Sequence, residues 1–348
     1  MESKTTASDK PRLVSNGRPT LRSLAEALDL SVTTVSRALK DGPEVRPDTI
    51  ARVKRAAAQV GYQPDARAVT LRTGATFTLC AALMSWDAED VGDASAIALM
   101  QGMQNGLEDT PYDLMSLSLR PEAEGLAAIQ RVVSRQLADG IVIDHTRSED
   151  RRVLYLLDRD FPFVTLGRTS IAEYHPFIDI DSEEGARRAT AHLIDKGHER
   201  IVLINPGPEF VYAGYRERGY WAALAQAGLS QARIINCAGL AAEDVRRAVR
   251  ALLCEKEAPS AFVTDNTTTT FGCLAAFADL GLQHGEDVDL VGNDGSRLSS
   301  FIPGAIPYIH FPHAQLGRLL IEFLQRRIEG EPVSRLQKVL STELVLPR

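Results

Sequence analysis

One short segment, residues 31–39, carries side chains whose chemistry suits contact with DNA bases. It starts with Ser31, a favoured helix cap, and its apolar residues Val35 and Leu39 lie four apart, as on the buried face of a helix. A guanidinium bonds two acceptors on a guanine edge, and side-chain methyl groups contact the thymine methyl. The outward face of the predicted helix offers such groups at Val32, Thr33 and Arg37.

Two further predicted helices would hold this segment in place. The first begins at Thr20, a favoured cap, and carries apolar residues at helical spacing up to Leu28. Only residues 29–30 separate it from the base-reading segment, so the pair predicts a helix-turn-helix, whose second helix fits the major groove of DNA. The third starts at Pro47, with proline at its favoured first position, and stops at Gly61.

Four sequence motifs occur here at characteristic spacing: Leu24-Ala25, Ser31-Val32-x-Thr34-Val35-Ser36-Arg37-x-Leu39, Gly61-Tyr62-x-Pro64 and Leu71-Arg72-Thr73-Gly74. Spaced in this way, they resemble the lactose-repressor (LacI/GalR) family of bacterial transcription regulators, and the resemblance extends across the rest of the chain. The sequence departs from the family at Arg46, where a Ser or Thr cap is usual, and at Lys40-Asp41, where Asn-Gly is usual. Neither departure removes a base-reading position.

The resemblance also implies a DNA contact beyond the three helices. In that family, the segment after the Gly-Tyr-x-Pro motif is a hinge helix that orders on operator DNA and wedges a Leu into the minor groove. The matching segment here is residues 65–74, and the matching residue is Leu71. The expected DNA-binding residues are Thr20, Ser31, Val32, Thr33, Thr34, Arg37, Tyr62, Leu71 and Arg72.

The net charge of −7 hides two unlike regions. Residues 1–74 carry 13 Lys and Arg against 8 Asp and Glu, whereas residues 75–348 carry 26 against 38. Phosphate contacts supply most non-specific affinity for DNA, so the charge favours DNA binding by the first region and keeps DNA off the second. A basic surface that is merely solvated would show the same imbalance.

Nothing in the sequence predicts export or membrane insertion. No apolar run reaches the roughly 20 residues that span a membrane, and residues 1–18 lack the apolar core of a secretory signal. We therefore expect a cytoplasmic protein. The cysteines are too scattered for a zinc site and suit reduced, mostly buried thiols: Cys80, Cys237, Cys254 and Cys273. We expect no metal, no cofactor and no catalytic residue.

From residue 77 the pattern changes to short apolar runs that alternate with amphipathic helices. Such alternation predicts parallel sheets covered by helices on both faces. Because single cores stop growing near about 250–300 residues, the chain suits a small all-α head and an α/β body. We expect the body to form two doubly wound parallel-sheet lobes around a cleft, which the resemblance likens to periplasmic binding proteins.

The expected domain boundaries follow from these patterns. We expect a disordered arm over 1–18, the helix-turn-helix domain over 19–64, the hinge helix over 65–74 and the effector-binding and dimerisation body over 75–348. Lobe 1 is expected to hold about residues 75–180 and 312–338, and lobe 2 about residues 181–308 and 339–348. Residues 339–346 are predicted to form one closing strand.

The loops after the strands predict where a ligand binds, because ligands of such sheets collect at the carboxyl ends of the strands. Trp86, Asp144 and Arg168 each follow a predicted strand, so we expect them to face the cleft. An aromatic ring can stack on a sugar face, and a strand-end Arg beside Gly167 has room to turn toward the cleft.

The resemblance adds three residues to this predicted pocket. Arg216 matches an Arg that holds sugar hydroxyls, Asn266 matches the Asn of an Asn-Asp motif whose Asp is replaced by Thr267, and Asp294 matches the carboxylate of a Gly-x-Asp turn. Planar guanidinium and carboxylate groups grip neighbouring hydroxyls by paired hydrogen bonds. We expect loss of Arg216 to abolish sugar binding without unfolding the lobes.

Several of these predictions also have a purely structural alternative. Arg216 could pair with Glu217 or another acidic residue on a solvated helix face. Asp294 lies in an Asn-Asp-Gly sequence that favours a turn. Trp86 could fill the edge of a lobe, and His145, next to Asp144, could be an ordinary surface histidine.

The combined pattern favours a sequence-specific DNA-binding transcription regulator, expected to repress sugar-utilisation genes under allosteric control by a small carbohydrate. We expect a homodimer on near-palindromic double-stranded operator DNA, with no membrane partner. Residues 163–168 and 175–179 resemble regulators of α-glucoside use, which makes an α-glucoside the first candidate effector. Two alternatives stay open: a two-lobed sugar-binding transport protein, which would need a secretory signal and no DNA head, and a sugar-acting enzyme, whose usual motifs we do not find.

Overall fold

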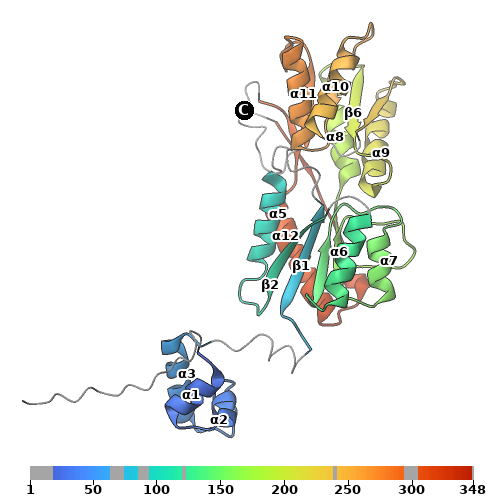
Figure 1. Ribbon diagram of the computed structural model, residues 1–348. Coiled ribbons are helices and arrows are strands. Elements are labelled where there is room, and N and C mark those ends of the chain that lie inside the picture. The colour runs from blue at the N-terminus through green and yellow to red at the C-terminus, as the bar shows by residue number, and fades with distance from the viewer. Residues whose placement is uncertain are drawn as a thin grey trace, which may run out of the picture. The chain divides into compact units, whose positions relative to one another are not determined.

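The computed structural model describes residues 19–62, 74–84, 94–119, 123–237, 241–293 and 305–346. Internal contacts separate two units, Met1–Thr76 and Phe77–Arg348, which we call the head and the body and describe each by itself. The predicted fold class, a small helical head with an α/β body of two parallel-sheet lobes, is confirmed (Figure 1).

The described part of the head contains three helices, α1 (Leu21–Leu28), α2 (Val32–Ala38) and α3 (Pro47–Val60). Thr20 starts α1, its side chain accepting a hydrogen bond from the backbone N–H of Ser23. Leu24, Val35 and Val53, one from each helix, are at most 1% exposed and lie in one core. The apolar positions that the sequence predicts therefore hold the three helices together.

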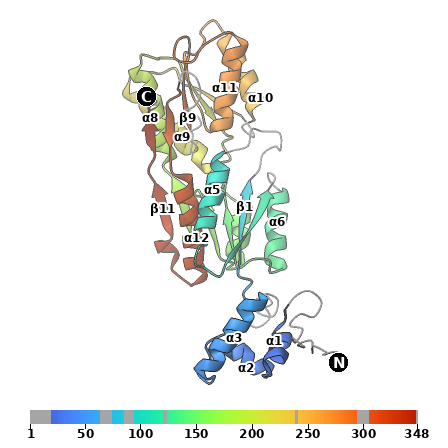
Figure 2. The same ribbon diagram turned by 90° about the vertical axis from the view of Figure 1, so that its left-hand side faces the viewer.

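Lobe 1 is built on a six-stranded parallel sheet in the order β11-β5-β4-β3-β1-β2. Its strands are β1 (Thr78–Met84), β2 (Asp113–Leu119), β3 (Gly140–Ile143), β4 (Phe163–Leu166), β5 (Phe177–Ile180) and β11 (Gln337–Leu340). Figures 1 and 2 show α5 (Ala94–Asn105) and α12 (His313–Ile328) on one face, with α6 (Ala123–Ser134) and α7 (Arg151–Asp158) on the other.

Lobe 2 repeats this arrangement in the order β12-β10-β9-β8-β6-β7. Its strands are β6 (Ile201–Asn205), β7 (Arg233–Asn236), β8 (Ala261–Val263), β9 (Asp289–Asn293), β10 (Tyr308–His310) and β12 (Glu343–Val345). All pairs are parallel except that β12 runs antiparallel to β10. The helices α8 (Ser182–Asp195) and α9 (Val211–Gln226) cover one face, and α10 (Ala242–Leu253) and α11 (Thr267–Asp279) cover the other.

The C-terminal strand prediction is wrong. Residues 339–346 do not form one strand, because β11 pairs with β5 in lobe 1 whereas β12 pairs with β10 in lobe 2. The chain crosses between the lobes at the turn around Thr342, whose hydroxyl donates to the carbonyl of Asp181 at 3.4 Å. Residues 339–340 accordingly belong to lobe 1. The break is not apparent in the sequence, because both halves of the segment contain apolar and β-branched residues that are typical of a strand.

Two short elements of lobe 1, α7 and β5, are missing from the sequence prediction. β5 lies between β4 and β11 in the sheet, and α7 covers one face of that sheet. Each is too short to give a clear periodic signal. The four cysteines are free thiols, and three of them are buried, as expected. Within the described ranges, no helix has the length and apolar character needed to cross a membrane.

Candidate functional site

The face of α2 that we expect to read bases is exposed to solvent. Ser31 caps the helix, its Oγ accepting a hydrogen bond from the backbone N–H of Thr34 at 3.0 Å. Val32 is 44% exposed, Thr33 is exposed, and the Arg37 side chain is 57% exposed. These three side chains therefore lie where a DNA groove could reach them.

Arg37 already has a partner within the head. Its Nε lies 3.1 Å from Oε1 of Glu44, whose side chain is 47% exposed. Ion pairs at such exposed positions contribute only about 0–1 kcal/mol, so a nucleic acid could displace this contact. Of the other expected DNA contacts, Thr20 serves as the cap of α1, and Tyr62 packs half-buried against the core of the head.

Four of the expected site residues lie outside the described residues. Leu71 and Arg72 fall in residues 63–73, together with most of the expected hinge helix. Trp86 falls in residues 85–93, and Asp294 falls in residues 294–304. Their expected roles stay predictions.

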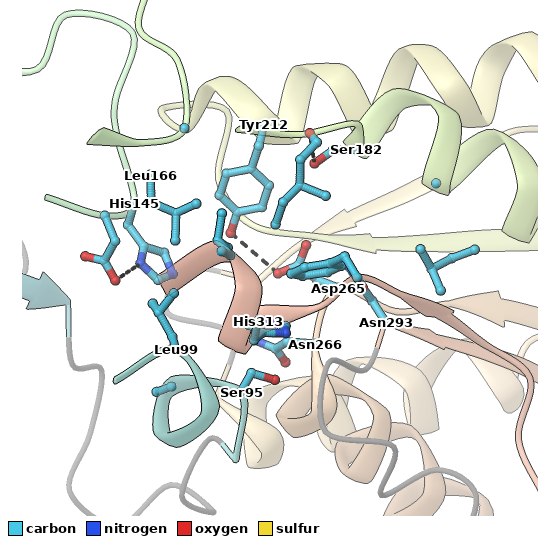
Figure 3. Close-up of a pocket in the computed structure, with 18 of the residues that line it drawn as sticks. Ser95, Leu99, His145, Leu166, Ser182, Tyr212, Asp265, Asn266, Asn293 and His313 are labelled. Atoms are coloured by element: carbon cyan, nitrogen blue, oxygen red, sulfur yellow. Dashed lines mark hydrogen bonds and ion pairs between the residues drawn. The ribbon is translucent and has the colours of Figure 1, made fainter. Parts of the chain in front are cut away.

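The body contains a cavity of about 530 Å³ between its two lobes (Figure 3). Lobe 1 contributes residues at the ends of three strands, Met84, Asp144 and Leu166, and lobe 2 contributes Thr264 and Asn293 in the same way. Carboxyl ends of strands are where doubly wound sheets bind ligands, and the volume falls within the roughly 300–1,000 Å³ of small-molecule sites.

Arg216 lines this cavity but is only 3% exposed, and it is hydrogen-bonded within the wall of lobe 2. Its Nε donates to Oδ1 of Asn205 at 3.0 Å, and its second terminal nitrogen donates to the carbonyls of Ile204 at 3.3 Å and Thr264 at 2.8 Å. Arg216 thus ties the carboxyl ends of β6 and β8 together. The alternative of a solvated surface pair with Glu217 is wrong, because Arg216 is buried.

Asp265 completes this group, and the sequence prediction missed it. Its Oδ1 lies 3.1 Å from Nε of Arg216, and its Oδ2 accepts a hydrogen bond of 3.5 Å from the hydroxyl of Tyr212, as Figure 3 shows. Burial raises the pKa of Tyr212 well above its usual value, and the nearby Asp265 carboxylate raises it further. Tyr212 therefore remains a hydrogen-bond donor at neutral pH.

Asn266 faces the cavity at the start of α11. Its side chain accepts a hydrogen bond from the backbone N–H of Thr269 at 2.8 Å, and the Thr269 hydroxyl accepts in return from the backbone N–H of Asn266 at 3.0 Å. This capping box fixes the side chain by satisfying two backbone donors of the helix start.

Asp144 and His145 form the lobe 1 side of the cavity. Oδ1 of Asp144 accepts from the backbone N–H of Met84 at 2.7 Å, and Oδ2 lies 2.9 Å from Nδ1 of His145. His145 has φ of 46°, a backbone conformation that non-glycine residues seldom adopt. Arg152 holds this turn by donating to the carbonyls of both residues at 3.0 and 3.1 Å.

The imidazole of His145 reaches across the cleft to lobe 2. Its ring centroid lies 6.3 Å from that of Phe210 and 6.4 Å from that of Tyr212, both in edge-to-face geometry. Burial lowers the pKa of His145, but the carboxylates of Asp144 and Asp265 outweigh it, so the pKa lies above the ordinary value. His145 is therefore a titratable contact between the lobes.

Arg168 is not among the residues that line the cavity. Its Nε contacts Oδ2 of Asp179 at 2.5 Å, and its guanidinium carbon lies 4.0 Å from the ring centroid of Tyr215 on lobe 2. Burial raises the pKa of Asp179, although Arg168 opposes the shift. Arg168 thus links the lobes beside the cavity, at the carboxyl end of β4.

Further lining residues had no clear signal in the sequence. Asn293 ends β9, and its side-chain oxygen is buried without a hydrogen-bond partner in the part of the chain that the structure describes. Phe311 and His313, whose ring centroids lie 4.2 Å apart, line the cavity where the chain crosses from lobe 2 to lobe 1. Only the position of Asn293, directly after a predicted strand, could have pointed to it.

Comparison with known proteins gives matches to both regions. Residues 20–65 match the family described as bacterial regulatory proteins, lacI family, and residues 190–347 match the periplasmic binding protein-like domain. The regulator AglR of Rhizobium meliloti is 30% identical over 79% of this chain and 77% of its own length. The regulator RafR of Escherichia coli is 28% identical over 91% of this chain and 94% of its own length.

Solved structures share the fold. The lac repressor dimer bound to operator and the anti-inducer ONPF aligns with a TM-score of 0.80 at 20% identity, covering 94% of this chain and 98% of that chain. The transcriptional regulator CelR in complex with cellobiose aligns with a TM-score of 0.70 at 24% identity, covering 94% and 99%. The helix-turn-helix head, the two-lobed body and the long matches to such regulators agree, and the chain therefore belongs to the lacI family of DNA-binding bacterial transcription regulators.

Proposed function

We propose that the body binds a small carbohydrate in its cavity and that this binding controls the affinity of the head for operator DNA. The cavity carries this proposal, because residues from both lobes line it, so that a ligand there changes the contacts between lobes. On this proposal the protein represses sugar-utilisation genes until the sugar binds.

The chemistry of the cavity wall supports a sugar ligand. Apolar residues such as Leu99 and Phe311 lie beside hydroxyl and amide groups, including those of Ser95, Tyr212 and Asn293. A sugar likewise combines apolar C–H faces with hydroxyl groups, and pockets fix such ligands with a few placed polar groups. Residues 163–168 and 175–179, which resemble regulators of α-glucoside use, keep an α-glucoside as the first candidate.

The proposed DNA complex uses two heads. One head presents one reading helix, so a symmetric dimer would bind a near-palindromic operator with half-sites about one helical turn apart, or a multiple of it. We propose base contacts from Thr33 and Arg37, and a hinge over residues 65–74 that places Leu71 in the minor groove. The dimer contact is proposed to involve α5 of lobe 1.

Three steps test this function. The full chain first selects its operator from a random DNA library, and a panel of neutral and charged sugars is then screened for a rise in melting temperature, since a ligand that binds only the folded body stabilises it. Sugar is finally titrated with and without saturating operator. Because coupling between two sites is reciprocal, operator should weaken sugar binding by the factor by which sugar weakens operator binding, about 5–150-fold.

The titration has a control and a contradicting result. A non-selected DNA duplex of the same length should leave sugar affinity close to its value without DNA. Equal sugar affinities with and without operator would contradict the allosteric scheme. Tighter sugar binding in the presence of operator would make the sugar a co-repressor and overturn the proposed direction of control.

A further inference from the structure

The charged side chains around the cavity are matched in pairs. Asp144 is paired with His145 at 2.9 Å, Asp179 with Arg168 at 2.5 Å, and Asp265 with Arg216 at 3.1 Å. Each carboxylate thus has a cationic or hydrogen-bonding partner supplied by the protein. The wall of the cavity carries little uncompensated charge toward a ligand.

Arg216 is the only Lys or Arg among the described residues that line the cavity. A phosphate or carboxylate ligand is usually gripped by a guanidinium that offers two parallel N–H groups. Here Nε of the guanidinium is directed at Asn205 and Asp265 instead, and one terminal nitrogen is directed at two backbone carbonyls. An anionic ligand would have to compete with Asp265 for this cation and would be repelled by that carboxylate.

The segments that adjoin the lining residues Met84 and Asn293 in the sequence contain no excess of positive charge. Residues 85–93 join Met84 to α5 and contain four acidic residues and no Lys or Arg. Residues 294–304 join Asn293 to the segment before β10 and contain one Asp and one Arg. Together, the two segments contain more acidic than basic residues.

Most of the remaining polar groups of the wall are neutral hydrogen-bonding groups, and His313 adds one titratable imidazole at the start of α12. The hydroxyls of Ser95, Ser116, Ser118 and Tyr212 both donate and accept hydrogen bonds. The buried side-chain oxygen of Asn293 is a hydrogen-bond acceptor that has no partner among the described residues. Buried acceptors are rarely left without a partner. The pairing of Asn293 with Ile309 between β9 and β10 fixes the backbone that aims it.

Building on the proposed sugar-effector function, we infer that this cavity selects an uncharged saccharide and rejects phosphorylated sugars and sugar acids, with Asn293 accepting a hydrogen bond from a ligand hydroxyl. A phosphate ester carries about −1.5 to −2 charges at neutral pH. Burying such a charge without a free cationic partner is strongly unfavourable. A neutral saccharide meets hydroxyl, amide and apolar groups without displacing any ion pair.

The first test uses the full chain and matched ligands in titration calorimetry. The neutral probes are maltose, trehalose, sucrose, cellobiose and raffinose, and the charged probes are trehalose 6-phosphate, glucose 6-phosphate, glucuronate and inorganic phosphate. We expect at least one neutral probe to bind and every charged probe to bind at least 100-fold more weakly than it. A charged probe that binds more tightly than all neutral ones would overturn this inference and leave the proposed function intact. Binding by no saccharide of either class would overturn the proposed function itself.

Two variants test the physical cause. Asp265→Asn keeps the shape of the side chain but removes the charge that compensates Arg216, so affinity for glucose 6-phosphate should rise at least tenfold. Asp279→Asn is the matched control. Asp279 pairs with Arg246 at 2.6 Å, and neither residue lines the cavity, so this variant should leave the affinity for glucose 6-phosphate unchanged. Unchanged phosphate affinity in a folded Asp265→Asn protein would refute the exclusion by charge.

Asn293→Leu keeps a similar volume and removes the acceptor. It should weaken binding of the neutral probe at least tenfold while the weak affinity for charged probes stays as it was. This variant keeps the inference testable if Asp265→Asn fails to fold. Full retention of neutral saccharide affinity in Asn293→Leu would remove Asn293 from the site.

Discussion

Arg37 in the head and Arg216 in the body are both candidates for recognition, but the protein holds them in opposite ways. The Arg37 side chain is 57% exposed and meets one half-exposed carboxylate, that of Glu44. The Arg216 side chain is 4% exposed and meets two carbonyls, one amide and one buried carboxylate. The head thus offers DNA a group that its fold does not need, whereas the cavity wall includes a group on which lobe 2 depends.

In the head, the arginine that is a candidate for recognition contributes little to stability, whereas the corresponding arginine in the body is a candidate for recognition that also contributes to stability. Exposed side chains away from special features usually change stability by no more than about 0.5 kcal/mol when substituted. A buried ion pair that loses one partner leaves an uncompensated charge. Base preference can therefore change at Arg37 at little cost in stability, while ligand preference has to change at other lining residues, such as Asn293.

The largest effect is expected from Arg216→Ala. It leaves Asp265 buried without its cation and removes the ties between β6 and β8, so the free energy of unfolding of the body should fall by about 3–5 kcal/mol. Urea unfolding followed by far-ultraviolet circular dichroism measures this. The expectation from the sequence, that loss of Arg216 leaves the lobes folded and removes only sugar binding, does not suit a residue that is 3% exposed.

Arg233→Ala is the matched control for that experiment. Arg233 pairs with Glu255 at 2.6 Å, and both side chains are more than 40% exposed, so its loss should cost about 1 kcal/mol or less. Equal destabilisation by the two substitutions would break the contrast between buried and exposed arginines.

The second effect concerns operator choice. Arg37→Ala should reduce the preference for operator over random DNA by about 1–3 kcal/mol, the usual value of a paired guanidinium contact to guanine. Its weak salt-dependent binding and its melting temperature should stay nearly unchanged, because Arg37 is outside the core of the head. Gel-shift competition with random DNA measures the preference, with Arg22→Ala on α1 as the control. Full operator preference in Arg37→Ala would exclude Arg37 as a base reader.

The sequence was most informative where one residue type decides local structure. Thr20 and Ser31 predicted the helix starts of the head, because a side-chain oxygen caps free backbone donors there. The alternation of apolar runs and helices predicted both lobes of the body. Arg216, Asn266 and Asp144 all line the cavity, which the strand ends and the family resemblance indicated together.

The sequence was least informative where distant segments meet. Only the fold shows that Asp265 pairs with Arg216, 49 positions earlier in the numbering. Arg168 follows a strand as the other pocket residues do, yet its direction depends on Asp179 and Tyr215, whose positions local sequence does not fix. The break at Thr342 likewise depends on which sheet each half of the segment joins.

The third effect distinguishes titratable contacts inside the body. The pKa of His145 is raised above its ordinary 6.5, so its protonated form stabilises the fold: this contribution is complete below 6.5 and is lost as the pH rises through the raised pKa. His145→Gln should therefore lower the melting temperature of the body most at the acidic end of a series from about pH 5 to about pH 8.

His192→Gln provides a control with the opposite sign. Burial and the nearby Lys196 lower the pKa of His192, so protonation destabilises the folded body as the pH falls below 6.5. The variant should gain melting temperature relative to the unaltered protein at acidic pH. Parallel pH trends for the two variants would contradict the assignment of His145 as a group whose protonated form is stabilised by Asp144 where it contacts lobe 2.

The smallest effect returns to the exposed arginine. Glu44→Gln removes the carboxylate that lies 3.1 Å from Arg37. Arg37 then no longer has to break an ion pair before it contacts DNA. An exposed pair contributes about 0.2–1 kcal/mol, which predicts an increase in operator affinity of at most about fivefold and almost no change in the stability of the head. Operator affinity is measured by fluorescence anisotropy at several salt concentrations, with Glu26→Gln, whose carboxylate pairs with Arg22 on α1, as the control. If Glu44→Gln instead weakens operator binding, Glu44 orients Arg37 for base contact, and the head then resembles the cavity wall in using a carboxylate to position its arginine.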